Sequence, residues 1–207
     1  AHVDAARIGE IEFISRGVSC RVTAKSWVDA SGDAVLCVTA GAAFEMAPAS
    51  KLQRPAFVFG MHSVQVEALH PEGRMRLAHQ IAQAVSAKSL SAGCLGAQFR
   101  ASGRGSEVYV TIDLAGEPDF DPNAPDQITR LERNGRGIAF EIYEFLRSRH
   151  PDFENAQLGA FPARVGIRES RRMLGRRTVS GEAVLSGAGC EEEVAIGTWP
   201  MELREAH

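Results

Sequence analysis

The chain has 207 residues, 44% of them hydrophobic and 24% charged, enough to bury the core of one large domain or two small ones. Its formal net charge of −3 argues against a general nucleic-acid or membrane-surface binder, because such proteins usually carry a basic excess. No apolar run approaches the roughly 20 residues of a membrane-spanning helix, and no signal peptide is visible. The four cysteines form no CxxC pair, which fits reduced, mostly buried thiols and a cytoplasmic location.

The first quarter of the chain predicts strands followed by a short helix. Residues 11–28 show the period of a half-buried strand, with Val18, Cys20 and Val22 alternating with polar positions and a turn near Arg16-Gly17. The strand ends at "VDASGDA", residues 28–34. The next stretch, "VLCVTAGAAFEM", predicts a short helix that Gly41 stops, followed by a polar connector over 47–56.

The rest of the chain predicts a sheet with helices packed on it. Residues 56–67 are rich in strand-forming residues, and residues 96–116 predict a hairpin turned at Ser102 to Ser106. Two helices are expected, one opened by Pro71 and a longer one over about Pro125 to Arg149 that ends ahead of His150-Pro151. The expected apolar faces are Leu77, Ile81 and Val85 in the first helix, Ile128, Leu131, Ile138, Ile142 and Phe145 in the second, and Val108, Val110, Ile112 and Leu114 in the hairpin.

The chain then predicts a strand over 161–170, a turn at Gly175 and one or two short helices after Ser180. Strands and helices therefore do not alternate regularly. This order predicts an α+β fold with a small strand-rich body and a β-sheet covered by helices.

The turn "DASGD" is the first candidate site. Ala30, Ser31 and Gly32 would allow a flat or phosphorylated ligand to approach the backbone closely, and Asp33 could accept a hydrogen bond from a ribose or ribityl hydroxyl. A plain turn after a strand is the alternative, because this tripeptide composition is common in turns.

The second candidate is the arginine-rich stretch "VGIRESRRMLGRR", residues 165–177. In an extended chain, Arg168 and Arg172 would share one face with the small Ser170 and leave an open, positively charged shelf, while Glu169 could hold Arg171 on the other face. Arginine forks suit carboxylates and phosphates because they donate two parallel hydrogen bonds. A solvated or self-paired edge strand is the alternative.

Other kinds of site find little support. The six histidines lack metal-ligand spacing, and there is no GxSxG elbow for a serine hydrolase. No GxGxxG follows a first strand, so the sequence does not predict a self-sufficient dinucleotide-binding fold.

Two separated stretches resemble one family. Residues 24–45, "AKSWVDASGDAVLCVTAGAAFE", resemble the segment of FAD-dependent oxidoreductases that runs from a hydrophobic strand through "DATGD" and a short helix to "AGAP". Residues 165–203 resemble the same family's "RESRRIxG" block and its later G-x-W/Y-P-I-D/E motif, here Trp199, Pro200 and Glu202. The group is related to the flavoprotein subunits of fumarate reductase and succinate dehydrogenase. Many members carry a histidine where this chain has Arg204, and His207 is only close by.

The resemblance implies the middle portion of such an enzyme. Residues 1–47 would be part of the FAD-binding domain, a β-meander with the turn, and residues 56–207 the substrate-binding or cap domain. FAD would contact Ala30, Ser31, Gly32 and Asp33, while Arg168, Arg171 and Arg172 would act beside the flavin and an anionic small-molecule substrate. The remaining FAD-binding segments would be partners of this chain, without nucleic acid or membrane.

Two alternatives remain open at this stage. The chain could be a catalytically silent excised domain, or an anion-binding or interaction module that uses the arginines without a flavin. If its flavin interface is uncovered, Val28, Leu36 and Val38 would face solvent, and a homo-oligomer would be one way to cover them.

Overall fold

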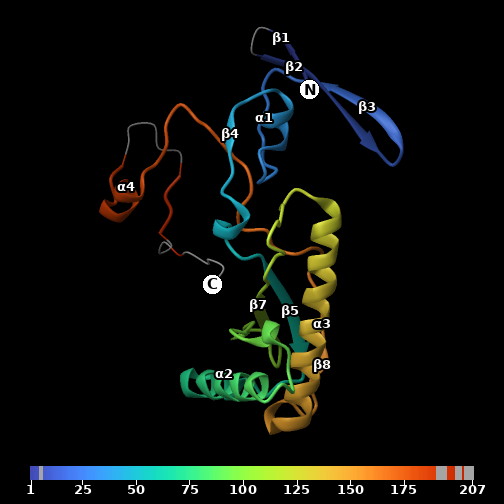
Figure 1. The fold of residues 1–207 in the computed structure, drawn as a ribbon, viewed down its shortest axis with the longest axis vertical. Coiled ribbons are helices and arrows are strands. Elements are labelled where there is room, and N and C mark those ends of the chain that lie inside the picture. The colour runs from blue at the N-terminus through green and yellow to red at the C-terminus, as the bar shows by residue number, and fades with distance from the viewer. Residues whose placement is uncertain (5–6, 190–194, 199–201, 203–207) are drawn as a thin grey trace. The chain divides into compact units, whose positions relative to one another are not determined.

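A computed structural model describes residues 1–4, 7–189, 195–198 and 202 (Figure 1). The chain divides into two compact units, one made of the described parts of 1–47 and 170–203, the other of Pro48–Glu169. Helices are combined with antiparallel sheets, which confirms the predicted α+β class. Among the described residues, no helix is long and apolar enough to cross a membrane.

The first unit begins with a three-stranded antiparallel sheet in the order β1-β2-β3. Its strands are β1 (His2–Asp4), β2 (Arg7–Ser15) and β3 (Val18–Thr23). Arg16 and Gly17 connect β2 to β3 with φ angles of 50° and 80°, the left-handed geometry that matches the twist of a tight hairpin. The predicted turn is therefore confirmed.

A short helix and a two-stranded ladder complete the first unit, together with a C-terminal helix. Helix α1 (Val35–Thr39) is followed by Gly41 at a φ of 84°, as predicted. Strand β4 (Phe44–Glu45) pairs with β9 (Arg172–Met173), and α4 (Gly181–Ser186) begins at Ser180, whose hydroxyl accepts the Ala183 N–H. Because β9 returns to β4, the described residues from Ser170 onward join the first unit instead of the second.

The second unit is built on a four-stranded antiparallel sheet in the order β6-β7-β5-β8. Its strands are β5 (Ala56–His62), β6 (Gln98–Ala101), β7 (Val108–Asp113) and β8 (Gln157–Leu158). One face of this sheet is the core of the unit, since its alternate side chains are at most 1% exposed: Phe57, Phe59, Met61, Val108, Val110 and Ile112. The hairpin between β6 and β7 and its apolar face confirm the prediction.

Helices α2 (Pro71–Ser86) and α3 (Pro125–Arg149) pack their apolar faces into this unit. The His70 Nδ1 accepts the Gly73 N–H at the start of α2, and Pro71 occupies its first turn. Helix α3 has the predicted bounds and ends at an extended His150, as expected before a proline. Its buried face is Leu131, Gly135, Ile138, Ala139, Ile142 and Leu146. Leu146 takes the buried place expected of Phe145, which is half-buried.

Four short 3-10 turns join these elements: η1 (Ala49–Lys51), η2 (Val66–Leu69), η3 (Ala92–Cys94) and η4 (Pro151–Phe153).

The strand predicted over 161–170 is wrong. Only Gly166 pairs with another strand, through an isolated bridge to Ala56 in which the two N–H to O distances are 2.8 and 2.9 Å. The residues that follow Gly166 in this stretch make side-chain contacts and do not pair with another strand. The side-chain alternation on which the arginine shelf was predicted therefore does not apply.

Cys94 is expected to resist alkylation in the folded protein. It is fully buried in η3, and burial raises the pKa of its thiol from 9.0 to about 11, which leaves about a hundredfold less thiolate at neutral pH. Cys20 is half-exposed in β3. Iodoacetamide labelling followed by peptide mass spectrometry should therefore modify Cys20 at least tenfold faster than Cys94. Equal rates would show that Cys94 is accessible.

Candidate functional site

The carboxylate of Asp29 organises the predicted flavin turn. Its Oδ1 accepts hydrogen bonds from the backbone N–H (3.0 Å) and hydroxyl (2.6 Å) of Ser31. Its Oδ2 accepts the Cys37 N–H at 3.0 Å, so one side chain ties the turn to α1. The Ser31 Oγ in turn accepts the Val35 N–H at 3.0 Å. Asp29 is thus a structural residue of the site, and its own carboxylate is fully engaged.

These bonds make the stability of the turn dependent on pH. The Ser31 hydroxyl and then the Cys37 N–H hold the pKa of Asp29 well below its ordinary value of 3.8. A depressed folded-state pKa contributes stability that is complete above about pH 4 and is lost as the pH falls toward the folded pKa. Asp29→Asn should therefore lower the free energy of unfolding by about 1 kcal/mol near pH 7, with a smaller effect near pH 3.

Urea unfolding at the two pH values measures this difference. Asp4→Asn is the control, because Asp4 is exposed in β1 of the same unit. A loss of stability for Asp29→Asn that is the same at both pH values would contradict the assignment.

The turn and the arginine block meet through Asp33. The Ser170 hydroxyl donates to the Asp33 Oδ1 at 2.5 Å, and the Arg171 Nε donates to the Asp33 backbone carbonyl at 3.0 Å. Ser170 is only 4% exposed, so this bond lies in a place that water reaches poorly. Two segments almost 140 residues apart are therefore one structural site within the first unit.

The other side of this site is the β4–β9 ladder. The Arg171 guanidinium lies over the Phe44 ring at 6.0 Å from its centroid, and Arg172 pairs with Glu45 at 3.6 Å. Arg172 and Glu45 are direct cross-strand partners with side chains about 60% exposed. An exposed pair of this kind contributes little to stability. Arg172 is thus a surface partner of Glu45, while Arg171 is half-buried against the turn.

Arg168 has a different environment from the one predicted. Its guanidinium lies 2.8 Å from the Asp113 Oδ1 at the end of β7 and also donates to the backbone carbonyl of Arg54. Ser170, predicted to open the shelf, is buried. The open shelf of Arg168, Ser170 and Arg172 is therefore not formed, because each of these side chains has a partner of its own. The Glu169 carboxylate accepts the Gln53 N–H at 3.2 Å.

The second unit also presents a surface that the sequence did not predict, the open face of its sheet. Strand pairing places Tyr109 between Gly60 and Arg100, and Thr111 between Val58 and Gln98. Cross-strand partners share a face, so these residues lie together on the face opposite the core, and the same face continues to Asp113 and its partner Arg168. Tyr109 and Val58 are each 37% exposed. The polar positions between the buried residues of 108–112 were the signal.

Parts of the predicted site are not tested by the structure. Trp199, Pro200, Arg204 and His207 lie outside the described residues. Within the described residues, no group of three or more His, Cys, Asp or Glu side chains could hold a metal ion. Val28 is 87% exposed, as expected, whereas Leu36 and Val38 are half-buried.

Comparison with known proteins gives one family. A family model described as FAD dependent oxidoreductase matches residues 1–207. Neither the search of curated proteins nor the search of solved structures found a significant match.

Proposed function

Since the chain belongs to the FAD dependent oxidoreductase family, whose cofactor is FAD, we propose that it supplies one wall of the flavin site and the substrate-recognition surface for hydride transfer. Residues 1–47 would be part of the FAD-binding domain, and the sheet of the second unit the core of the substrate domain. The observation that carries this proposal is the contact of Asp33 with Ser170 and Arg171, because it joins both motifs of the resemblance into one site.

The residues at the turn fit a flat cofactor. Ala30, Ser31 and Gly32 are small and exposed. Gly32 has a φ of 80°, and a Cβ built on it would meet no heavy atom of the described chain within 4 Å. The backbone here is thus both open and in a conformation that favours glycine. These residues and Asp33 would hold FAD, which when bound supplies the hydride acceptor.

The chain's own side chains would position charge around that group. Asp33 and Ser170 fix the turn, and Arg171 brings a positive charge against it. A preorganised guanidinium favours negative charge that develops at the site, whether on the substrate or on the cofactor. Arg172, being exposed, would contribute less.

Substrate recognition is assigned to the open sheet face. Asp113 and the Arg54 carbonyl hold the Arg168 guanidinium in a fixed orientation at the end of this face. A fixed arginine at the end of this face offers directional donors to an anionic substrate at little further cost in side-chain entropy.

The finer family assignment follows the motifs. The "DASGD" and "RESRR" blocks support a relation to the flavoproteins of fumarate reductase and succinate dehydrogenase, with this chain as the middle portion. Apolar side chains on the β1–β3 sheet, Ile14 at 79% and Val18 at 63% exposed, also support a meander that packs against other segments of an FAD-binding domain or against a second copy.

Dicarboxylate titration tests the substrate side of the proposal. Succinate should raise the melting temperature of the purified protein, and Arg168→Gln should weaken its binding about threefold to tenfold. Arg76→Gln, an exposed arginine on α2, is the matched control and should leave binding unchanged. Equal binding by the two variants would remove Arg168 from substrate recognition.

A further inference from the structure

A cavity at the end of the second unit's sheet has an arginine, Arg54, in its lining. The cavity measures about 240 Å³ and lies between residues 49–55 and residues 115–120. The Leu114 N–H donates to the Pro55 carbonyl at 2.8 Å, which fixes these two segments side by side. Most of the lining is apolar, including Leu52, Pro55 and Phe120. Arg54 also lines it, and its Nε is buried without a hydrogen-bond partner among the described residues.

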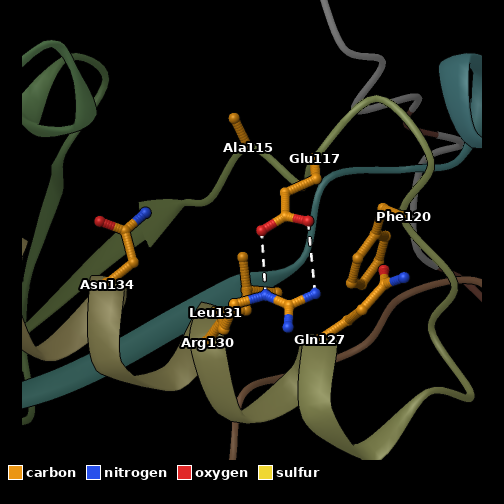
Figure 2. Close-up of a pocket in the computed structure, with 8 residues that line it drawn as sticks. Ala115, Glu117, Phe120, Gln127, Arg130, Leu131 and Asn134 are labelled. Atoms are coloured by element: carbon orange, nitrogen blue, oxygen red, sulfur yellow. Dashed lines mark hydrogen bonds and ion pairs between the residues drawn. The ribbon is translucent and has the colours of Figure 1, made fainter.

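Two acidic side chains of this region, Glu117 and Asp113, are engaged by other arginines. Both oxygens of Glu117 accept from Arg130, at 3.0 and 3.3 Å, and Figure 2 shows this pair beside the neighbouring cavity of about 190 Å³. Arg130 also binds Asp126 at 2.9 Å, and these contacts raise its pKa. Asp113 is the partner of Arg168. Neither carboxylate is paired with Arg54, whose Nε has no hydrogen-bond partner among the described residues.

A half-buried guanidinium without an ion pair can bind an anionic group that enters the cavity. The chemistry of the cavity defines the ligand that would satisfy it. A carboxylate would accept from the Arg54 guanidinium, and an apolar body would contact Leu52, Pro55 and Phe120. The volume exceeds the roughly 150 Å³ that accommodates a benzene ring.

We infer that this cavity is a binding site for a small monocarboxylate with an aromatic or branched apolar body, anchored by Arg54. It lies within the second unit, and it does not depend on the proposed function. Phe120 forms part of the walls of both cavities. Its ring leaves no room for a side chain on Gly116, where a Cβ would lie 2.6 Å from the Phe120 Cγ.

Benzoate is the probe, with benzamide as its uncharged counterpart of the same shape. Isothermal titration calorimetry of the full 207-residue chain should show benzoate binding at least tenfold tighter than benzamide. Arg54→Gln should weaken benzoate binding tenfold or more, whereas Arg76→Gln should leave it unchanged. Circular dichroism confirms that each variant is folded.

A second variant tests the cavity by filling it and leaves the charge of Arg54 unchanged. Ala115→Leu extends a side chain from the lining of both cavities and should also weaken benzoate binding while leaving Arg54 in place. Equal affinities for benzoate and benzamide, or equal binding by the Arg54→Gln and Arg76→Gln variants, would overturn the inference. If Arg168→Gln loses succinate binding but keeps benzoate binding, this cavity and the proposed substrate surface are two different sites.

Discussion

Gly135→Ala is expected to lower the free energy of unfolding by about 1–3 kcal/mol, although alanine is the better helix former. A Cβ at position 135 would lie 2.7 Å from the Phe57 Cδ2 and 2.8 Å from its Cγ, with the Leu114 Cδ1 at 3.2 Å. Phe57 is 1% exposed and Leu114 also 1%, so neither side chain has free space into which it can move. Helix α3 would have to shift away from β5.

Gly137→Ala in the same helix is the matched control. A Cβ there would meet nothing within 4 Å, and the residue is exposed. The change should therefore raise the free energy of unfolding by about 0.5–1 kcal/mol, because glycine is unfavourable in a helix interior. Urea unfolding of the two variants measures both values. The same sign of effect for both would contradict the packing of α3 described above.

The second large effect is expected at the contact between Asp33 and Ser170. Ser170 is 4% exposed, so Ser170→Ala leaves the Asp33 carboxylate without a buried donor and should cost about 1–2 kcal/mol. In a double-mutant cycle with Asp33→Asn, the two changes should show a coupling free energy of about 1 kcal/mol or more.

The hairpin of the same unit offers a control for this cycle. The Ser19 hydroxyl donates to the Glu12 carboxylate at 2.6 Å, which is the same kind of bond in an exposed position. Ser19→Ala with Glu12→Gln should therefore show a much smaller coupling, since water replaces the lost partner. Additive effects at Asp33 and Ser170 would mean that the turn and the arginine block are not one site.

The sequence predicted the second unit well where its signals were local. Pro125 and His150-Pro151 mark the two ends of α3, and the period of its apolar residues selected Leu131, Ile138 and Ile142 correctly. The turn between β6 and β7 and the alternation of Val108, Val110 and Ile112 likewise defined the hairpin. In these segments the residues that specify the structure lie close together in the chain.

The structural features that the sequence did not predict depend on pairing between segments that lie far apart in the chain. Residues 161–170 contain Val165 and Ile167 in a strand-like pattern, yet Gly166 makes only one bridge, and the nearby strand β9 pairs with β4 from the start of the chain. Periodicity gives the side to which a residue points in a strand, but it does not identify the partner strand. No local feature of the sequence therefore indicated the boundary between the two units at Ser170.

In the candidate site, too, the local features could be predicted from the sequence and the long-range contacts could not. The turn at Asp29–Asp33 could be located from its small residues and glycine, and the family resemblance indicated that it belongs with the arginine block. The partners of Arg168 and Arg172 could not be predicted, because Asp113 and Glu45 are distant in the sequence. Their pairing removes the open shelf and leaves Arg171 as the arginine that contacts the turn.

Flavin titration of two glycine variants tests the account most directly. Gly32 and Gly17 both have a φ of 80° and open space at the Cβ position, so leucine should strain the backbone equally at either place. Only Gly32 lies in the proposed flavin wall. We expect fluorescence titration with FAD to show affinity at least tenfold weaker for Gly32→Leu than for Gly17→Leu, since the added side chain blocks the approach. Equal affinities in the two variants would contradict the placement of FAD against this turn.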